Sequence, residues 1–191
     1  MPMRMQWLAL LTVCLPSAAA LGLSTDSDQP IQIEADRAEA NDAQQVSVYR
    51  GDVVIVQGTL RISGDVVTIH YDDDRQLSKM VAVGQPARFR QLPDGDTEYQ
   101  QARARRMEYY ADDDLIILLG DAESWQGGDR IKAQRIVYDT RDGRVNADSE
   151  LPASMQAETD EGVGPQKSRV RVTIVPRDCP DDEKDASGRC P

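Results

Sequence analysis

The chain contains an internal repeat, and this repeat restricts the possible folds more than any single motif. Shifted by 69 residues without gaps, residues 35–75 overlay residues 104–144. The identical pairs are mostly turn formers and charged residues: Ala35/Ala104, Arg37/Arg106, Glu39/Glu108, Gly51/Gly120, Asp52/Asp121, Gln57/Gln126, Gly58/Gly127, Arg61/Arg130, Ile62/Ile131, Asp73/Asp142 and Arg75/Arg144. The apolar pattern recurs with them, so the halves are predicted to fold alike and to pack on one another.

Each half consists of short apolar runs separated by turn residues. The runs rich in β-branched residues are Val53–Val56, Leu60–Ile62, Val66–Ile69, Leu77–Val83, Leu115–Leu119, Ile136–Tyr138 and Val170–Val175. Turn signals lie between them, and the Gly-Asp pairs at 51–52 and 120–121 are predicted to be turns. The spacing leaves no room for crossover helices, so we predict an all-β fold with sequential antiparallel pairing.

One segment, Ala102–Ala111, has a residue composition that a helix would also accept. Its neighbours on both sides are predicted strands, and the repeat overlays it on a segment of the first half. We therefore predict a strand here as well.

The predicted strands alternate between apolar and polar residues, which gives each strand one apolar face. Ile31, Ile33, Leu60, Ile62, Val67 and Ile69 lie on that face in the first half. A sheet of this kind buries its apolar face by folding into a sandwich or a roll. The chain has a single Phe, and an interior of medium-sized aliphatic residues is either an ordinary core or a slot for acyl chains.

The charge balance excludes some classes of partner. The chain has 22 basic and 33 acidic residues, a net charge of −11. Nucleic-acid binding requires a basic surface, so nucleic acid is not expected as a partner. Spontaneous adsorption to anionic lipid headgroups is disfavoured for the same reason.

The first twenty residues have the pattern of a secretory signal peptide. Arg4 precedes an apolar stretch, residues 7–15, and small residues follow at 16–20. Cys14 follows Val13, where a lipoprotein signal needs a small residue, so a lipid anchor is not expected. We predict that residues 1–20 are removed on export to the periplasm.

The end of the sequence differs in composition from the body. Residues 177–191 contain four Asp and two Pro, which predicts a flexible acidic tail after a folded domain at 21–176. Cys179 and Cys190 lie in this tail, and in an oxidising compartment they are expected to pair as a local disulfide. Their spacing is not that of a redox motif, and no His lies nearby to complete a metal site.

The sequence shows no catalytic or cofactor motif. His70 is the only histidine, and the repeat aligns it with Asp139. A triad or metal cluster would need partners that the sequence does not provide. The Asp triplets at 72–74 and 112–114 lack the ligand spacing of a calcium loop and are interpreted as solvated turns. We therefore expect neither an enzyme nor a bound cofactor or metal.

A family resemblance supports a more specific interpretation. The stretch 28–36, Asp-Gln-Pro-Ile-Gln-Ile-Glu-Ala-Asp, resembles the N-terminal signature of the OstA-like family. Matches follow in order at 51–53, 57–62, 84–89, 107–109, 119–122, 131–133, 136–138 and 169–176. No single motif is specific, but their order and spacing cover nearly the whole body. The two tail cysteines depart from the family pattern.

The resemblance implies a twisted antiparallel β-jellyroll that is open at both ends. It also implies a periplasmic protein that carries lipopolysaccharide from the inner to the outer membrane, with the acyl chains of lipid A shielded in an apolar groove. Such proteins stack head to tail through their edge strands. The expected partners are an LptC-like inner-membrane protein at the N-terminal edge and an LptD-like outer-membrane protein at the C-terminal edge.

Under this interpretation, the residues expected to point inward and contact acyl chains are Ile31, Ile33, Leu60, Ile62, Val67, Ile69, Phe89, Met107, Tyr109, Leu115 and Ile117. Two other classes remain open from the sequence: a structural envelope module without bound lipid, and a hydrolase or other enzyme. Crosslinking of lipopolysaccharide to an interior position would separate them.

Overall fold

The described residues form a single antiparallel β-sheet. The computed structural model describes residues 25–26, 28–152 and 169–175, and this part contains no helix that is long and apolar enough to cross a membrane. The strands are β1 (Gln32–Glu34), β2 (Arg37–Asn41), β3 (Val46–Gln57), β4 (Leu60–Tyr71), β5 (Leu77–Gln91), β6 (Gln100–Tyr110), β7 (Leu115–Gln126), β8 (Asp129–Asp139), β9 (Arg144–Asp148) and β10 (Arg171–Thr173). The all-β prediction is confirmed, including the strand predicted over Ala102–Ala111.

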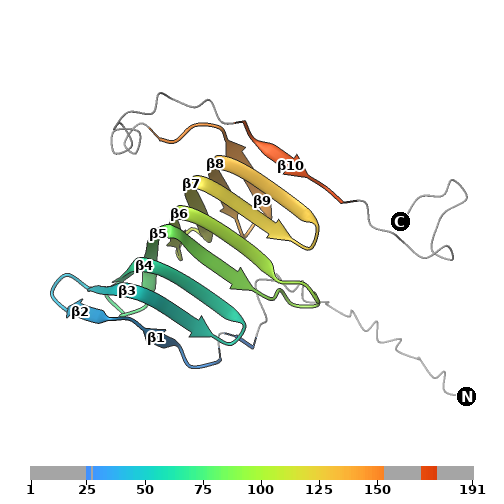
Figure 1. Cartoon of the computed structure of the whole chain (residues 1–191). Helices are drawn as coiled ribbons and strands as arrows, with labels where there is room; N and C mark the ends of the chain where they lie inside the picture. Colours follow the sequence, from blue (N-terminus) through green and yellow to red (C-terminus); the bar gives the residue numbers. More distant parts are fainter. Residues whose placement is uncertain (1–24, 27, 153–168, 176–191) are drawn as a thin grey trace, which may run out of the picture.

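The strands pair mostly in sequence order. The sheet runs β1-β3-β4-β5-β6-β7-β8-β10, while β2 also pairs with β3 and β9 with β8. Each end of the sheet is therefore formed by two short strands on one long neighbour (Figure 1). The sheet does not close on itself, so it keeps two edges, as the predicted open jellyroll requires.

Every long strand is interrupted near its middle, and the interruptions divide the sheet into two layers. The register shifts in all five pairs from β3–β4 to β7–β8, and Figure 1 shows the sheet bending there. We call layer A the part containing β1, β10 and residues 53–57, 60–63, 87–91, 100–103, 122–126 and 129–133. Layer B contains β2, β9 and residues 46–50, 66–71, 77–83, 106–110, 115–119 and 135–139.

The Gly-Asp pairs are β-bulges within strands, so the prediction of turns at these pairs was wrong. Gly51-Asp52 lies inside β3 and Gly120-Asp121 inside β7, at the register shifts. Both residues of each pair have positive φ, 80° and 42° in β3 and 77° and 48° in β7. Glycine adopts this conformation without steric cost, and a bulge bends the strand without ending it. The separately predicted runs Leu60–Ile62 and Val66–Ile69 are likewise one strand, β4.

The structure confirms the internal repeat residue by residue. The 69-residue shift carries β3 onto β7 and β4 onto β8, with the bulges in register. It also carries β1 and β2, which are two separate strands, onto the single strand β6. For example, Glu34 lies opposite Val54 in the first half, and the equivalent Arg103 lies opposite Glu123 in the second half. The first half thus ends in β5 and the second half begins with β6.

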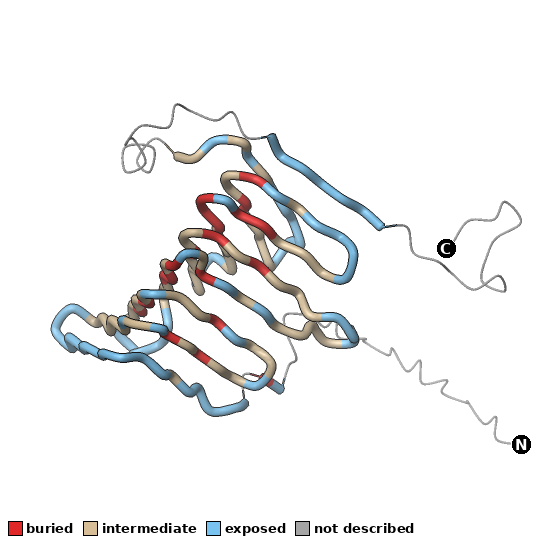
Figure 2. Tube along the Cα trace, viewed as in Figure 1, coloured by how far each residue is buried: buried red, intermediate tan, exposed pale blue. Residues whose placement is uncertain are grey.

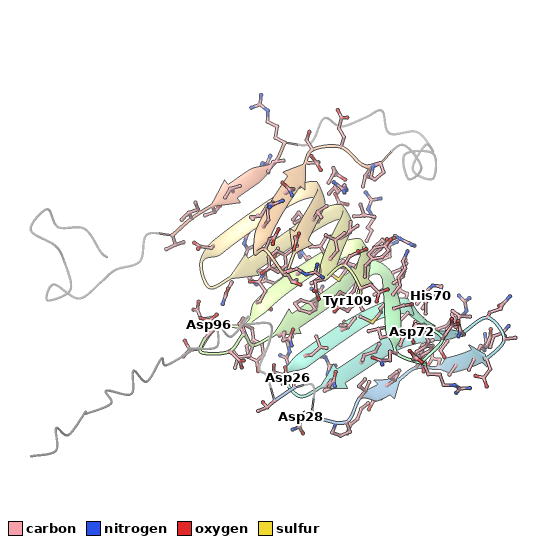
Figure 3. All side chains as sticks on the ribbon, turned by 180° about the vertical axis from the view of Figure 1, so that it is seen from behind. Asp26, Asp28, His70, Asp72, Asp96 and Tyr109 are labelled. Atoms are coloured by element: carbon pink, nitrogen blue, oxygen red, sulfur yellow. The ribbon has the colours of Figure 1, made fainter. Side chains whose placement is uncertain are left out.

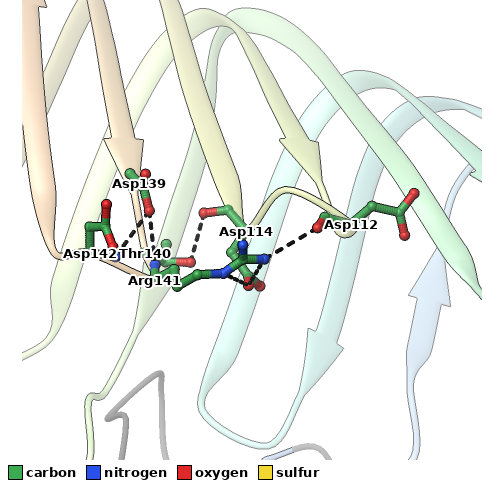
Figure 4. A network of polar contacts seen from close by, with 6 residues as sticks. All are labelled: Asp112, Asp114, Asp139, Thr140, Arg141 and Asp142. Atoms are coloured by element: carbon green, nitrogen blue, oxygen red, sulfur yellow. Dashed lines mark hydrogen bonds and ion pairs between the residues drawn. The ribbon is translucent and has the colours of Figure 1, made fainter.

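Equivalent turns are closed by equivalent hydrogen bonds. The Tyr71 N–H donates to the Gln45 carbonyl at 2.9 Å, and the Thr140 N–H donates to the Asp114 carbonyl at 2.9 Å. In the second half Arg141 adds an ion pair to the Asp114 carboxylate, with Nη2 at 3.0 Å (Figure 4). These contacts tie the β6–β7 turn to the β8–β9 turn at the outer end of layer B.

Both layers contribute to one apolar core. Val53, Val67 and Ile136 are the largest fully buried side chains. Burial decreases toward the two ends of the sheet, where β2 and β10 are exposed along their length and β1 is exposed except at Ile33 (Figure 2). Large apolar side chains are exposed there too: Ile31 is 60%, Val172 58% and Ile174 75% exposed.

Several predictions concern residues outside the described part of the chain. These are the signal peptide at 1–20, the tail at 177–191 and the pairing of Cys179 with Cys190. The domain boundaries 21–176 stay a prediction for the same reason.

Candidate functional site

The candidate site is the apolar interior between the two layers, built from rows of side chains that cross the sheet. In layer B, directly paired residues form one inward row: Tyr49, Val67, Ala82, Met107, Leu118, Ile136 and Ala147. All of them belong to the core cluster or pack against it. Because the pairing fixes which side chains share a face, this row runs continuously from β3 to β9.

Layer A has a matching inward row that reaches both edges. It consists of Ile33, Ile55, Ile62, Phe89, Ala102, Ser124, Ile131 and Val172. Ile55, Ile62 and Ala102 are buried, whereas Ile33 and Val172 lie at opposite edges of the sheet. Among the described residues, the inward row of layer A therefore ends in an apolar side chain at both edges of the sheet.

Where the sheet bends, the inward positions carry small side chains. They are Gly64, Ala87, Ala104, Ala122 and Ala133, and Gly64 lies directly opposite Val53. A Cβ at Gly64 would lie 2.7 Å from the Val83 carbonyl oxygen, so even alanine would force the backbone to move. Ala87 and Ala104 are fully buried and directly opposite each other. Small residues permit the close approach that folds one layer over the other.

Several inward positions at the outer end of layer A carry glutamine side chains, beside Leu60. Gln91 pairs with Gln100, and Gln100 pairs with Gln126. Gln100 donates to the Ser124 hydroxyl at 2.8 Å, and Gln126 donates to the Asp96 carboxylate at 2.8 Å. We call this outer end, with its adjoining turns, the rim of layer A.

Most of the residues predicted to point inward do share the face of the core. Ile62, Val67, Ile69 and Met107 are buried, while Ile33, Leu60 and Phe89 are partly exposed and pack against the buried cluster. Tyr109 pairs with Met80 and Ile116 on the same face and is half-buried. Ile31 precedes β1 and is mostly exposed at the edge.

The predicted orientation of Leu115 and Ile117 was wrong. Ile117 pairs with Glu108 and Val137, on the face opposite the core. Ile116 and Leu118 point inward instead, and both belong to or pack against the core cluster. Residues 115–119 are all apolar, so the sequence offers no alternation from which to choose a face.

Sequence reasoning also missed Asp26, a buried carboxylate that fastens the chain to the rim of layer A. It accepts hydrogen bonds from the Thr59 N–H at 2.8 Å, the Thr59 hydroxyl at 2.6 Å and the Gln91 amide at 3.3 Å. Burial raises the pKa of Asp26, but these hydrogen bonds outweigh it and hold the pKa below its usual value. Figure 3 labels Asp26 and Asp96 at one end of the strands and His70 and Asp72 at the other.

The outer face carries two charge clusters. Glu108 accepts a hydrogen bond from the Tyr110 hydroxyl and pairs with Lys79 and Arg106. Glu123, whose side chain is 3% exposed, pairs with Arg103, Arg130 and Lys132. Burial raises the pKa of each carboxyl group, but the hydrogen bonds and the neighbouring cations lower it by a larger amount. Both pKa values therefore lie below the usual value for Glu.

We predict that Glu123→Gln lowers the free energy of unfolding at pH 7 by about 1–3 kcal/mol, because three cations lose a buried counter-charge. A carboxyl group with a lowered folded-state pKa stabilises the fold above its unfolded pKa, and this contribution is lost as the pH falls through the folded value. Denaturant titrations should therefore separate variant from wild type at pH 7 and converge in strong acid.

The matched control is Asp65→Asn, because the exposed Asp65 carboxylate makes no hydrogen bond or ion pair within the described residues. It should leave stability nearly unchanged. A Glu123→Gln protein as stable as wild type at pH 7 would contradict the role assigned to this cluster.

The residues with possible catalytic or metal-binding chemistry have structural roles. His70 lies on the outer face of β4, opposite Lys79 and Val46. The Asp139 carboxylate accepts the N–H groups of Arg141 and Asp142 at 3.1 and 3.0 Å and so holds a turn (Figure 4). Across residues 25–26, 28–152 and 169–175, no three His, Cys, Asp or Glu side chains converge on a metal-binding geometry.

The sequence matches known lipopolysaccharide transport proteins. Residues 32–144 match the family described as "LptA/(LptD N-terminal domain) LPS transport protein". The lipopolysaccharide export system protein LptH of Pseudomonas aeruginosa is 38% identical over 137 residues, which cover 72% of this chain and 78% of LptH. LptA of Escherichia coli K12 is 29% identical over 171 residues, covering 84% of this chain and 90% of LptA.

The fold matches as well. The crystal structure of LptH, the periplasmic LptA homologue of the lipopolysaccharide transport device of P. aeruginosa, superposes with a TM-score of 0.65 at 32% identity, covering 80% of this chain and 99% of that one. A shorter match, 40% over 76 residues, covers 40% of this chain and 9% of the LPS-assembly protein LptD of Vibrio cholerae. With the family model spanning β1 to the start of β9, the chain belongs to the non-enzymatic family of LptA-like lipopolysaccharide transport proteins.

Proposed function

We propose that this protein carries lipopolysaccharide across the periplasm, with the acyl chains held between layers A and B. The observation that carries the proposal is the continuity of the inward rows. In layer A the row extends from Ile33 at one edge to Val172 at the other and is apolar at every position except Ser124, so an almost continuous apolar path runs along the sheet. A path of this kind suits a long apolar cargo that must enter at one end and leave at the other.

The energetics favour acyl chains as the part of the cargo that is bound. Each methylene group removed from water contributes about 0.8 kcal/mol, so several chains supply far more than a single polar contact. Partly exposed inward residues such as Leu60, Phe89 and Ile116 would meet the chains first. Fully buried residues such as Val53 and Val67 hold the layers together.

We further propose that copies stack head to tail through the two edges of the sheet. The molecule provides its own template for that junction, because β5 of the first half pairs with β6 of the second. Strands β10 and β9 pair with β8 at the positions equivalent to those at which β5 pairs with β4. In the same way, strands β1 and β2 pair with β3 at the positions equivalent to those at which β6 pairs with β7.

Applying the β5–β6 register to the edges pairs compatible residues of different copies. Val172 then faces Ile33, and Ile174 faces Ile31, so exposed apolar side chains cover one another. Arg171 faces Glu34, and Asp148 faces Arg37, which places opposite charges together. An exposed edge that would otherwise invite aggregation becomes a docking strand by β-augmentation.

The same edges are proposed to receive the membrane-bound partners. An LptC-like inner-membrane protein would pair with β1 and β2, and an LptD-like outer-membrane protein with β9 and β10. The match to part of an LptD supports related strands in that protein. Residues 1–20 would direct export to the periplasm, the compartment named for the LptH homologue.

Removing the acyl chains from lipopolysaccharide tests the proposed cargo site. We expect the full-chain protein to bind intact lipopolysaccharide at least about a hundredfold more tightly than the alkali-deacylated saccharide, since most of the binding energy comes from burying the chains. Phe89→Ser should weaken binding of the intact molecule only. Equal affinity for both ligands would contradict an acyl-chain site between the layers, and failure to bind either ligand would favour a structural envelope module without bound lipid.

A further inference from the structure

The outer face of layer A carries a concentration of positive charge that the acyl-chain site does not use. Two outward rows flank the inward row, and directly paired residues place seven cationic side chains on them. We call them the basic band: Arg61, Arg88, Arg90, Arg103, Arg130, Lys132 and Arg171. The whole chain has a net charge of −11, so this face has the opposite sign to the molecule as a whole.

The cations of the band are placed against one another. Arg61 lies directly opposite Arg90, Arg88 opposite Arg103, and Lys132 opposite Arg171. Like charges directly opposite each other across strands destabilise a sheet. Three such pairs on one face are therefore an unfavourable arrangement for the free protein, and a bound anion would relieve it.

Only part of this charge is neutralised within the protein. Glu123 is the single carboxylate inside the band, and it pairs with Arg103, Arg130 and Lys132. In the described part of the chain, the remaining four arginines have no carboxylate partner: Arg61, Arg88, Arg90 and Arg171. Arg171 is the residue proposed to face Glu34 of the next copy, whereas Arg61, Arg88 and Arg90 are exposed and can bind phosphate in the bidentate geometry that arginine favours.

Aromatic side chains lie among the cations. The Arg130 guanidinium lies 5.5 Å from the centre of the Trp125 ring, and that of Arg90 lies 5.2 Å from the centre of the Tyr99 ring. Aromatic faces offer apolar surface on which sugar rings can stack, and the stacked arginines are held in place beside them. A surface that combines guanidinium groups with Trp and Tyr fits a phosphorylated sugar better than a bare phosphate.

The band adjoins the rim of layer A, where the inward side chains Gln91, Gln100 and Gln126 are polar. Arg61 is the second residue of β4, Arg90 the penultimate residue of β5, and Arg130 the second residue of β8. Each is thus one residue from the rim of layer A. The second outward row lies about 7 Å farther from the rim, since residues on one face repeat every two positions.

Two of the carboxylates at the rim accept hydrogen bonds from the protein itself. Asp96 accepts a hydrogen bond from the Gln126 amide, and Asp129 accepts one from the Val175 N–H at 2.8 Å. Glu34, at the N-terminal edge of the second row, is the residue proposed to face Arg171 of the next copy.

We propose that the basic band binds the phosphorylated sugar headgroup of lipopolysaccharide while the acyl chains lie between the layers. This inference rests on the proposed transport function. It adds a second site on the outer face of layer A, in which Arg61 and Arg90 bind phosphate and Trp125 and Tyr99 contact sugar.

The probe that tests the band is alkali-deacylated lipopolysaccharide, a soluble phosphorylated saccharide without acyl chains. We expect the full-chain protein to bind it with an affinity that falls steeply with salt, and to bind the enzymatically dephosphorylated saccharide at least tenfold more weakly. Replacing two guanidinium contacts in Arg61→Gln/Arg90→Gln should weaken binding by about tenfold or more. Thermal stability should not fall in this variant, because a like-charge pair is removed.

Arg50→Gln is the matched control, because Arg50 is an exposed arginine in layer B, outside the band. It should leave saccharide binding unchanged. Equal binding of the phosphorylated and dephosphorylated saccharides would overturn the proposal, as would an equal effect of Arg50→Gln. Band-dependent binding to phosphatidylglycerol vesicles without binding to the saccharide would overturn it too, in favour of a membrane surface.

The two sites can fail separately. If intact lipopolysaccharide does not enter the interior but the deacylated saccharide binds the band, the transport proposal fails and the band stands. If Phe89→Ser weakens binding of intact lipopolysaccharide while the saccharide is not bound at all, the band proposal fails and the transport proposal stands.

Discussion

Replacing Ile62 with Asp is expected to lower the free energy of unfolding by about 4 kcal/mol, a large part of the 5–15 kcal/mol that stabilises a typical domain. Ile62 is 5% exposed and points inward in layer A. The substitution removes apolar contacts and buries a charge that no cation on the inward face can neutralise. Denaturant unfolding measures the loss, and any folded variant should bind lipopolysaccharide poorly.

Ser63→Asp is the matched control because it introduces the same side chain one residue later. Ser63 lies on the outer face directly opposite Arg88, so the new carboxylate gains a partner. Its effect on stability should lie within about 0.5 kcal/mol of zero and be favourable in sign. Equal destabilisation by the two substitutions would contradict the assignment of faces in β4.

Val172→Asp is expected to abolish head-to-tail association while leaving the folded monomer intact. Val172 is 58% exposed in a single molecule and would face Ile33 of the next copy. The charge would be buried without a partner only in the assembly. Light scattering over a concentration series should show a monomer, with a melting temperature close to that of wild type.

The register of the junction can be tested by exchanging charges. Arg171→Glu places two carboxylates opposite each other across the proposed junction, and Glu34→Arg places two guanidinium groups there. Each should weaken association, and the double variant should recover it because the pair is restored with reversed polarity. A double variant that associates less than either single variant would exclude the register derived from β5 and β6.

The sequence allowed the repeat to be predicted because its turn residues are conformationally demanding. Gly58 and Gly127 both have positive φ in equivalent turns, 57° and 54°, so identical residues mark identical backbone geometry. The same signal misled at Gly51 and Gly120, since positive φ is required by a bulge as much as by a turn. Local sequence does not distinguish a strand that bends from a strand that ends.

Other features depend on contacts between distant residues and have no local signature. Asp26 binds Thr59 and Gln91, which lie 33 and 65 residues away in the sequence. The basic band takes cations from four long strands and from β10, and total composition points to an acidic protein. Strand register was needed to bring those cations onto one face.

The central claim is that lipopolysaccharide lies between the layers, and neighbouring residues of β7 test it most directly. Ile116 and Ile117 are the same residue type, adjacent in sequence, and on opposite faces of layer B. A photoreactive amino acid is introduced at position 116 or at position 117 in cells that transport lipopolysaccharide. The two variants then report on the interior and the exterior of layer B at the same place in the sheet. We predict strong crosslinking to lipopolysaccharide from position 116 and little from position 117. Crosslinking from position 117 as strong as from position 116 would contradict the account.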